Sequence, residues 1–144
     1  FGGLPWLALA RTDQQNHNSH SKKGKGFIKR LRKWASKGSI VCKAMHAFLL
    51  AEDMAKNAKT EDVLALFDEC IADVTSWSTT HYFSMRALVN ERAGVFCLER
   101  NLLSKASTYL SRALDLYSAW QAWAKVRQLE KLYVSTKLRQ LACQ

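Results

Sequence analysis

Apolar residues recur along most of the chain at three- and four-residue intervals, the spacing of one face of an α-helix. The clearest stripe lies between residues 27 and 35, in the order Phe27, Ile28, Leu31, Trp34, Ala35. Basic residues occupy the opposite face of this segment. The same spacing predicts further helices over about 40–57, from 60 onward, over about 81–100, after Ser104, and from Trp123 to Tyr133. We therefore predict an all-α protein of about six helices joined by short turns.

Residues typical of helix ends separate these segments. Gly38 is expected to end the first helix, because glycine commonly follows a helix C-terminus. Thr60 is a suitable N-cap, and the two acidic residues after it complement the positive end of the helix dipole. The break at residues 77–80 is expected to cap the fourth helix, and Ser104 the fifth.

Two predicted hairpins share a small–large–small spacing on their second helices. One copy is Val63, Phe67, Cys70 and the other is Ala106, Leu110, Ala113. Twelve residues before each copy comes Ala51 or Gly94, where a small side chain lets two helices approach closely. This offset is typical of tetratricopeptide repeats, although the copies lie 43 residues apart instead of about 34. Ordinary helical hairpins also produce such spacing. Both readings predict tetratricopeptide-like stacked helical hairpins.

Composition agrees with helices and adds an uneven charge. The chain has 144 residues, one proline, six glycines and a formal net charge of +10. Residues 1–45 hold ten basic residues and one acidic residue, whereas the remainder holds twelve and eleven. The front of the chain is therefore strongly basic and the rest is nearly neutral.

The polar segment from Arg11 to Gly26 lacks an apolar period and is expected to be a flexible linker. His17 and His20 lie within it and are assigned to a solvated loop. We therefore divide the chain into three parts. Residues 1–25 are the end of a preceding helix plus this linker, 26–134 the helical domain, and 135–144 a basic tail.

Residues that could carry chemistry are scattered. Cys42 and His46 would form half a metal site on one helix face, but small buried thiols in a cytoplasmic protein are the preferred interpretation of the four cysteines. No phosphate-binding loop is present, and the acidic pairs fall at helix starts or solvated faces. We predict no catalytic, metal or cofactor-binding residues, no small-molecule substrate, and no enzymatic activity for this segment.

Two groups of residues are candidates for an interaction surface. One group belongs to a basic stretch and comprises Lys29, Arg30, Arg32 and Lys33. This stretch could bind phosphates or lie on an anionic membrane. Alternatively, its apolar stripe packs inward and its charges face water. Tyr117, Trp120 and Trp123 form a three-spaced row that either packs in the core or offers a ledge to a peptide.

Several segments together resemble one family of very large signalling proteins. Segment 27–35 is similar to its "LKKWA" helix, and 86–94 to its "EALANELAG" stretch. Further similar segments follow in order: 48–52, 62–72, 106–113, 117–120 and 124–130. Gln121 stands where the family usually has glycine after the tryptophan. The resemblance covers about residues 5–133.

Members of that family join a serine/threonine kinase-like domain, an AAA-type ATPase domain, a tetratricopeptide-like helical region, a GAF domain and a sensor histidine kinase. The resemblance is to the helical region, so it implies a non-catalytic scaffold that couples domains or binds a protein partner. The alternative is a basic adaptor that binds nucleic acid or anionic lipid through residues 22–37.

Overall fold

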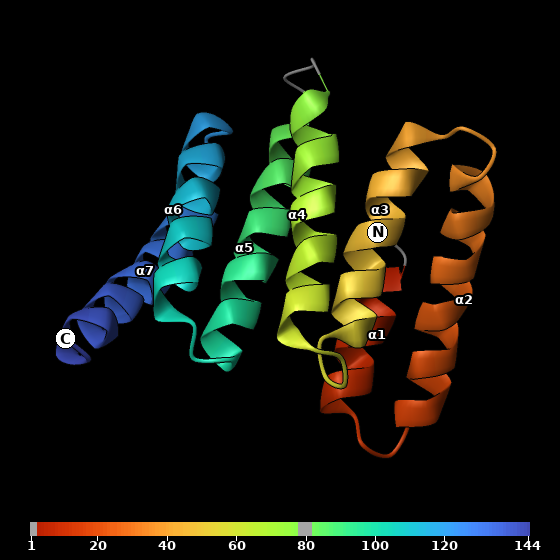
Figure 1. Cartoon of the computed structure of the whole chain (residues 1–144), viewed down its shortest axis with the longest axis horizontal. Coiled ribbons are helices and arrows are strands. Elements are labelled where there is room, and N and C mark those ends of the chain that lie inside the picture. Colours follow the sequence, from red (N-terminus) through yellow and green to blue (C-terminus); the bar gives the residue numbers. More distant parts are fainter. Residues whose placement is uncertain (1–2, 78–81) are drawn as a thin grey trace. The chain divides into compact units, whose positions relative to one another are not determined.

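The computed structural model describes residues 3–77 and 82–144, apart from the side chains of Leu4, Trp6 and Arg11. Over these residues the chain forms helices and no strand (Figure 1). The helices are α1 (Gly3–Thr12), α2 (His17–Ala35), α3 (Ile40–Met54), α4 (Thr60–Ser76), α5 (Phe83–Glu99), α6 (Leu103–Ala119) and α7 (Trp123–Ala142). The predicted fold class, all-α with stacked helical hairpins, is confirmed. The chain divides into two compact units, Phe1–Asp73 and Val74–Gln144.

In the first unit, α2 packs against both α1 and α3. The inner face of α3 carries small residues around one large aromatic ring: Ala44, Ala47 and Ala51 are buried, as is Phe48. The Phe48 ring lies 6.3 Å from that of Phe67 on α4. Small residues on α3 thus allow neighbouring helices to approach, as the sequence spacing indicated.

The predicted linker over residues 11–26 is wrong, because most of it belongs to α2, which begins at His17. The turn before this helix is held by Asp13. Its carboxylate accepts hydrogen bonds from the backbone and side chain of Asn16, at 3.2 and 3.1 Å. These bonds, together with the hydrogen bond between Asp13 and His20, lower the pKa of Asp13. His17 Nδ1 donates to the Ala10 carbonyl at 2.6 Å. Local hydrogen bonds therefore stabilise the start of α2, although the sequence there has no apolar stripe that predicts a helix.

Tertiary packing at Gly24 also stabilises this helix. Gly24 is buried, and a Cβ built there would lie 2.4 Å from Leu7 Cδ2. Leu7 is itself buried on α1. The polar sequence of α2 is thus stabilised by a close crossing with α1, a tertiary contact that helical periodicity does not reveal.

In the second unit, α6 packs against α5 and α7. Their buried side chains form one core cluster, namely Ala87, Leu110, Ala113, Tyr117, Val126 and Leu129. Helix α5 approaches α6 at Gly94, where a Cβ would lie 2.8 Å from Leu110 Cδ2. The predicted basic tail over 135–144 is also wrong in part, because α7 continues to Ala142 and buries Thr136.

The turns after α2, α5 and α6 share one geometry. Gly38, Asn101 and Gln121 each adopt a positive φ, at 91°, 58° and 59°. After α6, the backbone N–H of Ala122 donates to Tyr117 and that of Gln121 to Ser118, both at 2.9 Å. This pair of bonds defines a Schellman cap. Gln121 therefore ends its helix where the resembled family has glycine.

Most predicted boundaries agree with the structure to within a few residues. Helix α3 ends at Met54, short of the predicted residue 57. Ser104 lies inside α6, whose N-cap is Leu102, and Thr60 is the first residue of α4. The predicted start at His81 lies outside the described residues, as do residues 78–80 of the predicted break.

Candidate interaction surfaces

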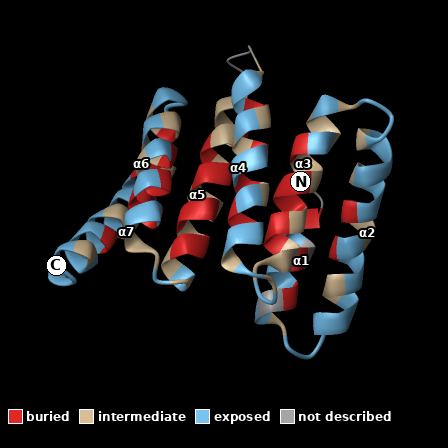
Figure 2. Ribbon diagram, in the orientation of Figure 1, coloured by how far each residue is buried: buried red, intermediate tan, exposed pale blue. Residues whose placement is uncertain are grey.

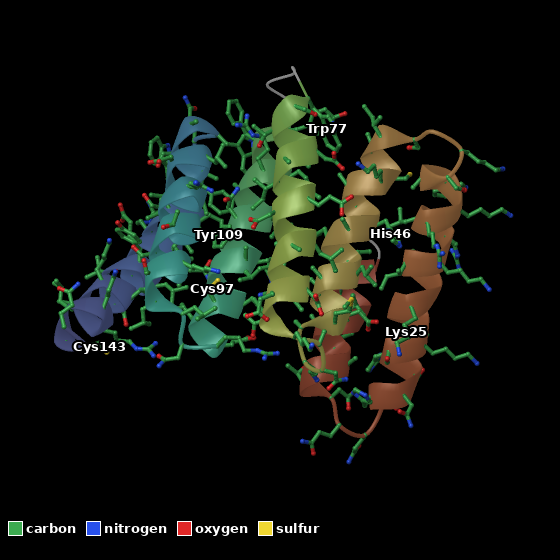
Figure 3. All side chains as sticks on the ribbon, viewed as in Figure 1. Lys25, His46, Trp77, Cys97, Tyr109 and Cys143 are labelled. Atoms are coloured by element: carbon green, nitrogen blue, oxygen red, sulfur yellow. The ribbon has the colours of Figure 1, made fainter. Side chains whose placement is uncertain are left out.

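The four basic candidates on α2 all lie on its solvent side. Lys29, Arg30, Arg32 and Lys33 are exposed and Gly24 and Ile28 are buried, and Figure 2 shows α2 with both buried and exposed positions. Long side chains ending in nitrogen extend from this helix into solvent (Figure 3). We call these four residues the basic face.

The apolar stripe beneath the basic face is only partly covered. Ile28 is buried and Leu31 is half-buried, but Trp34 remains 53% exposed. The Arg30 guanidinium lies 5.2 Å from the centre of the Phe27 ring, a cation–π contact at the edge of the stripe. Packing of the stripe against α3 therefore accounts for its first half and leaves the tryptophan in solvent.

Helix α4 contrasts with α2, since all its charged side chains are carboxylates. Glu61, Asp62, Asp68 and Glu69 are exposed. Lys43 on α3 reaches α4, with its ammonium 3.2 Å from Asp73 and 3.7 Å from Glu69. The hydrogen bond to Asp73 raises the pKa of Lys43. The first unit therefore has one basic helix and one acidic helix.

The aromatic row separates into a core residue and two surface residues. Tyr117 is buried in the core of the second unit, while Trp120 and Trp123 are 50% and 55% exposed. The Tyr117 hydroxyl donates to Glu91 at 2.5 Å, and the Lys125 ammonium donates to the other carboxylate oxygen at 2.7 Å. Burial is the main cause that raises the pKa of Tyr117. This residue therefore links α5, α6 and α7 as a neutral phenol.

Sequence reasoning missed a second apolar face on α7. Val134, Leu138 and Leu141 are each more than half exposed, and their i, i+4, i+7 spacing places them on one side of the helix. Val126, Leu129 and Thr136 lie on the buried side. The spacing was visible in the sequence, but the assignment of residues 135–144 to a tail obscured it. We call Trp123, Val134, Leu138 and Leu141 the α7 outer face.

A polar hollow of about 360 Å³ lies in the first unit between α1, α2 and the end of α3. Lys25 and Glu52 are among its lining residues, with His17 and Asp53. Glu52 is buried. The wall thus mixes both signs of charge with apolar side chains from α1, without a convergent set of groups that defines one reaction.

Two of the four thiols and His46 show the effects of burial. Cys70 and Cys97 are buried, and desolvation raises the pKa of Cys70 to about 12. Burial, followed by the charge of Arg32, lowers the pKa of His46. Within residues 3–77 and 82–144, no three His, Cys, Asp or Glu side chains are grouped to hold a metal ion. Figure 3 places Cys143 at the C-terminal end of α7, where it is exposed.

Fold and surfaces together define an all-α helical-hairpin protein with charged and apolar faces turned to solvent. Comparison with protein families, with curated proteins and with solved structures finds no match. The resemblance to the kinase and ATPase signalling family therefore stays a prediction from the sequence. None of the helices, over the part of the chain that the structure describes, is long and apolar enough to cross a membrane.

Proposed function

We propose that this chain is a non-catalytic helical scaffold that binds a partner protein through the α7 outer face. The observation that carries the proposal is the exposure of Val134, Leu138 and Leu141 along one side of a helix whose other side is already packed. Contiguous exposed apolar side chains typically mark an interaction site.

The energy available at this face is sufficient for a specific contact. Full burial of an exposed Val or Leu side chain contributes roughly 1.5–3 kcal/mol, and these three are more than half exposed. Trp120 and Trp123 lie at the α6–α7 turn, and tryptophan is enriched among residues that dominate binding energy. Residues 123–141 span about 27 Å along the helix axis, the length of a partner helix of similar size.

The charges beside the α7 outer face indicate the chemistry of the partner. Arg127, Lys131 and Lys137 are exposed on α7, against the single acid Glu130. A second copy would place α7 bases against one another, which disfavours self-pairing. An amphipathic helix with acidic flanks matches both the apolar and the charged positions.

Peptide display against the immobilised full chain tests this function. Enriched peptides should carry apolar residues at i, i+4 and i+7 with acidic neighbours. Leu138→Asp should abolish their binding, whereas Ser135→Asp, an equal charge change at another exposed position of α7, should leave it nearly unchanged. Peptides that bind both variants equally would contradict the proposal.

The wider assignment, a coupling region of a kinase- and ATPase-containing signalling protein, rests on the ordered motifs of the sequence. It predicts such domains in the reading frame around residues 1–144. Sequencing the transcript on both sides tests it separately from peptide binding. Flanking sequence without a kinase-like or ATPase domain would remove the family and leave the scaffold proposal standing.

A further inference from the structure

A tightly bonded turn joins α2 to α3 and presents two large apolar side chains. Gly38 adopts a φ of +91°, and its N–H donates to the Ala35 carbonyl at 3.0 Å. The next N–H, of Ser39, donates to the Trp34 carbonyl at 3.3 Å, while the Ser39 hydroxyl accepts from the Cys42 N–H. Trp34 and Ile40 therefore flank a fixed turn. We call residues 33–40 the hairpin tip.

Both apolar residues of the hairpin tip face solvent. Trp34 is 53% exposed and Ile40 is 65% exposed. Ile40 lies one residue after the N-cap of α3, outside the buried set of that helix, which starts at Ala44. The fold of the first unit therefore leaves the contact area of these two side chains unused.

The sequence on both sides of the hairpin tip carries charge of a single sign. Residues 14–51 contain nine Lys and Arg and no acid. Lys33 and Lys37 lie within the tip and are exposed, and the rest of the basic face continues from it along α2. Lys43, one of these nine, is engaged by the carboxylates of Glu69 and Asp73 on α4. The charged side chains of the hairpin tip itself, Lys33 and Lys37, are thus both positive.

We propose that the hairpin tip docks on an anionic lipid bilayer. Trp34 and Ile40 enter the headgroup region, where amphipathic and aliphatic side chains gain from leaving water, and the lysines meet lipid phosphates. The sequence left nucleic acid and anionic lipid open. The exposed Ile40 favours lipid, because gripping a phosphate backbone needs cations and has no use for an aliphatic side chain. This docking is independent of the partner at α7.

Co-sedimentation of the full chain with vesicles tests the proposal. The chain should sediment with mixed phosphatidylcholine–phosphatidylserine vesicles and not with phosphatidylcholine alone. The double variant Trp34→Ser, Ile40→Ser should lower the partition coefficient at least about tenfold. Its control, Leu9→Ser, removes another exposed apolar side chain of the first unit and should bind as the unchanged chain does.

Charge substitutions test the contribution of the basic side chains to membrane binding. Replacement of Lys29, Arg30, Lys33 and Lys37 by glutamine should lower binding roughly a hundredfold or more, since each near-surface charge contributes about fivefold. Replacement of Lys56, Lys59, Lys105 and Arg112 by glutamine removes the same net charge at exposed positions outside the proposed surfaces and should change binding little. Circular dichroism of each variant should show the helical spectrum of the unchanged chain.

Three results would overturn the proposal. One is equal sedimentation with neutral and anionic vesicles, and another is no sedimentation at low salt. The third is binding to a duplex oligonucleotide that displaces vesicles while the Trp34 and Ile40 variant binds vesicles normally. That outcome would assign the basic face to nucleic acid.

Discussion

Two glycine crossings, one in each unit, show the same packing device in different sequence settings. A Cβ at Gly24 would lie 2.4 Å from Leu7, and a Cβ at Gly94 would lie 2.8 Å from Leu110. Each pair brings two helices together, α1 with α2 and α5 with α6. Around Gly94 the sequence is apolar and periodic, whereas around Gly24 it is Ser-Lys-Lys-Gly-Lys-Gly. Only the crossing at Gly94 could therefore be recognised from the sequence.

The surroundings of the two leucines also differ. Leu110 is fully buried in the core cluster of the second unit, next to Ala87 and Ala113. Leu7 lines the polar hollow, so open space lies beside it. We therefore expect Leu7 to shift more easily than Leu110 when a side chain is added opposite it. The variants below test this difference.

Gly94→Val should have the largest effect. The new side chain has no room against Leu110, and overpacking of a core typically costs about 1–3 kcal/mol, to which the β-branch adds little in a helix. We expect the free energy of unfolding to fall by about 2–3 kcal/mol, measured by urea denaturation followed by circular dichroism. A loss below about 1 kcal/mol would show that α5 and α6 can separate freely.

Gly24→Val should destabilise the chain less, by about 1–2 kcal/mol, because Leu7 can shift into the hollow. Hydrogen exchange should become faster in α1 and the first half of α2, and stay unchanged in α6 and α7. A loss as large as that of Gly94→Val would mean that the hollow does not accommodate the leucine.

These crossings also show which parts of the fold the sequence could predict. Helices with an apolar stripe, such as α3 and α6, were placed to within a few residues, because their pattern records the face that they bury. The first half of α2 was missed, because its stability comes from the Asp13 turn and from contact with α1. Such tertiary and capping contacts leave no periodic pattern.

For the candidate surfaces too, periodicity predicts some features and tertiary contacts decide the others. The charges of the basic face are exposed, as amphipathic spacing indicated, while binding through them stays a prediction. The exposure of Trp34, Trp120 and Trp123 was not predictable, because a tryptophan on a stripe is usually packed. Whether a neighbouring helix covers the tryptophan depends on the length and crossing angle of that helix. The sequence of one segment does not determine these two properties.

Gln121→Gly tests whether the residue that ends α6 is strained, since the corresponding position after α2 is already a glycine, Gly38. Gln121 has a positive φ of 59°, a conformation that costs a residue with a Cβ about 1 kcal/mol. Replacement by glycine should therefore raise the free energy of unfolding by about 0.5–1 kcal/mol, measured by the same urea titration. Asn101→Gly serves as the comparison and should gain less, because asparagine tolerates this conformation. An equal gain at both sites would show that the glutamine is not strained.

Gly26→Ala should give the smallest change, and of opposite sign to Gly24→Val. Gly26 lies in the same helix, two residues from Gly24, but a Cβ there meets nothing within 4 Å. Alanine restricts the unfolded chain and favours helix, so the free energy of unfolding should rise by about 0.5 kcal/mol. Thermal denaturation of the two variants side by side should then move Tm in opposite directions. A fall in Tm for Gly26→Ala would mean that α2 needs flexibility along its glycine segment, and the close contact with Leu7 would no longer suffice to explain Gly24.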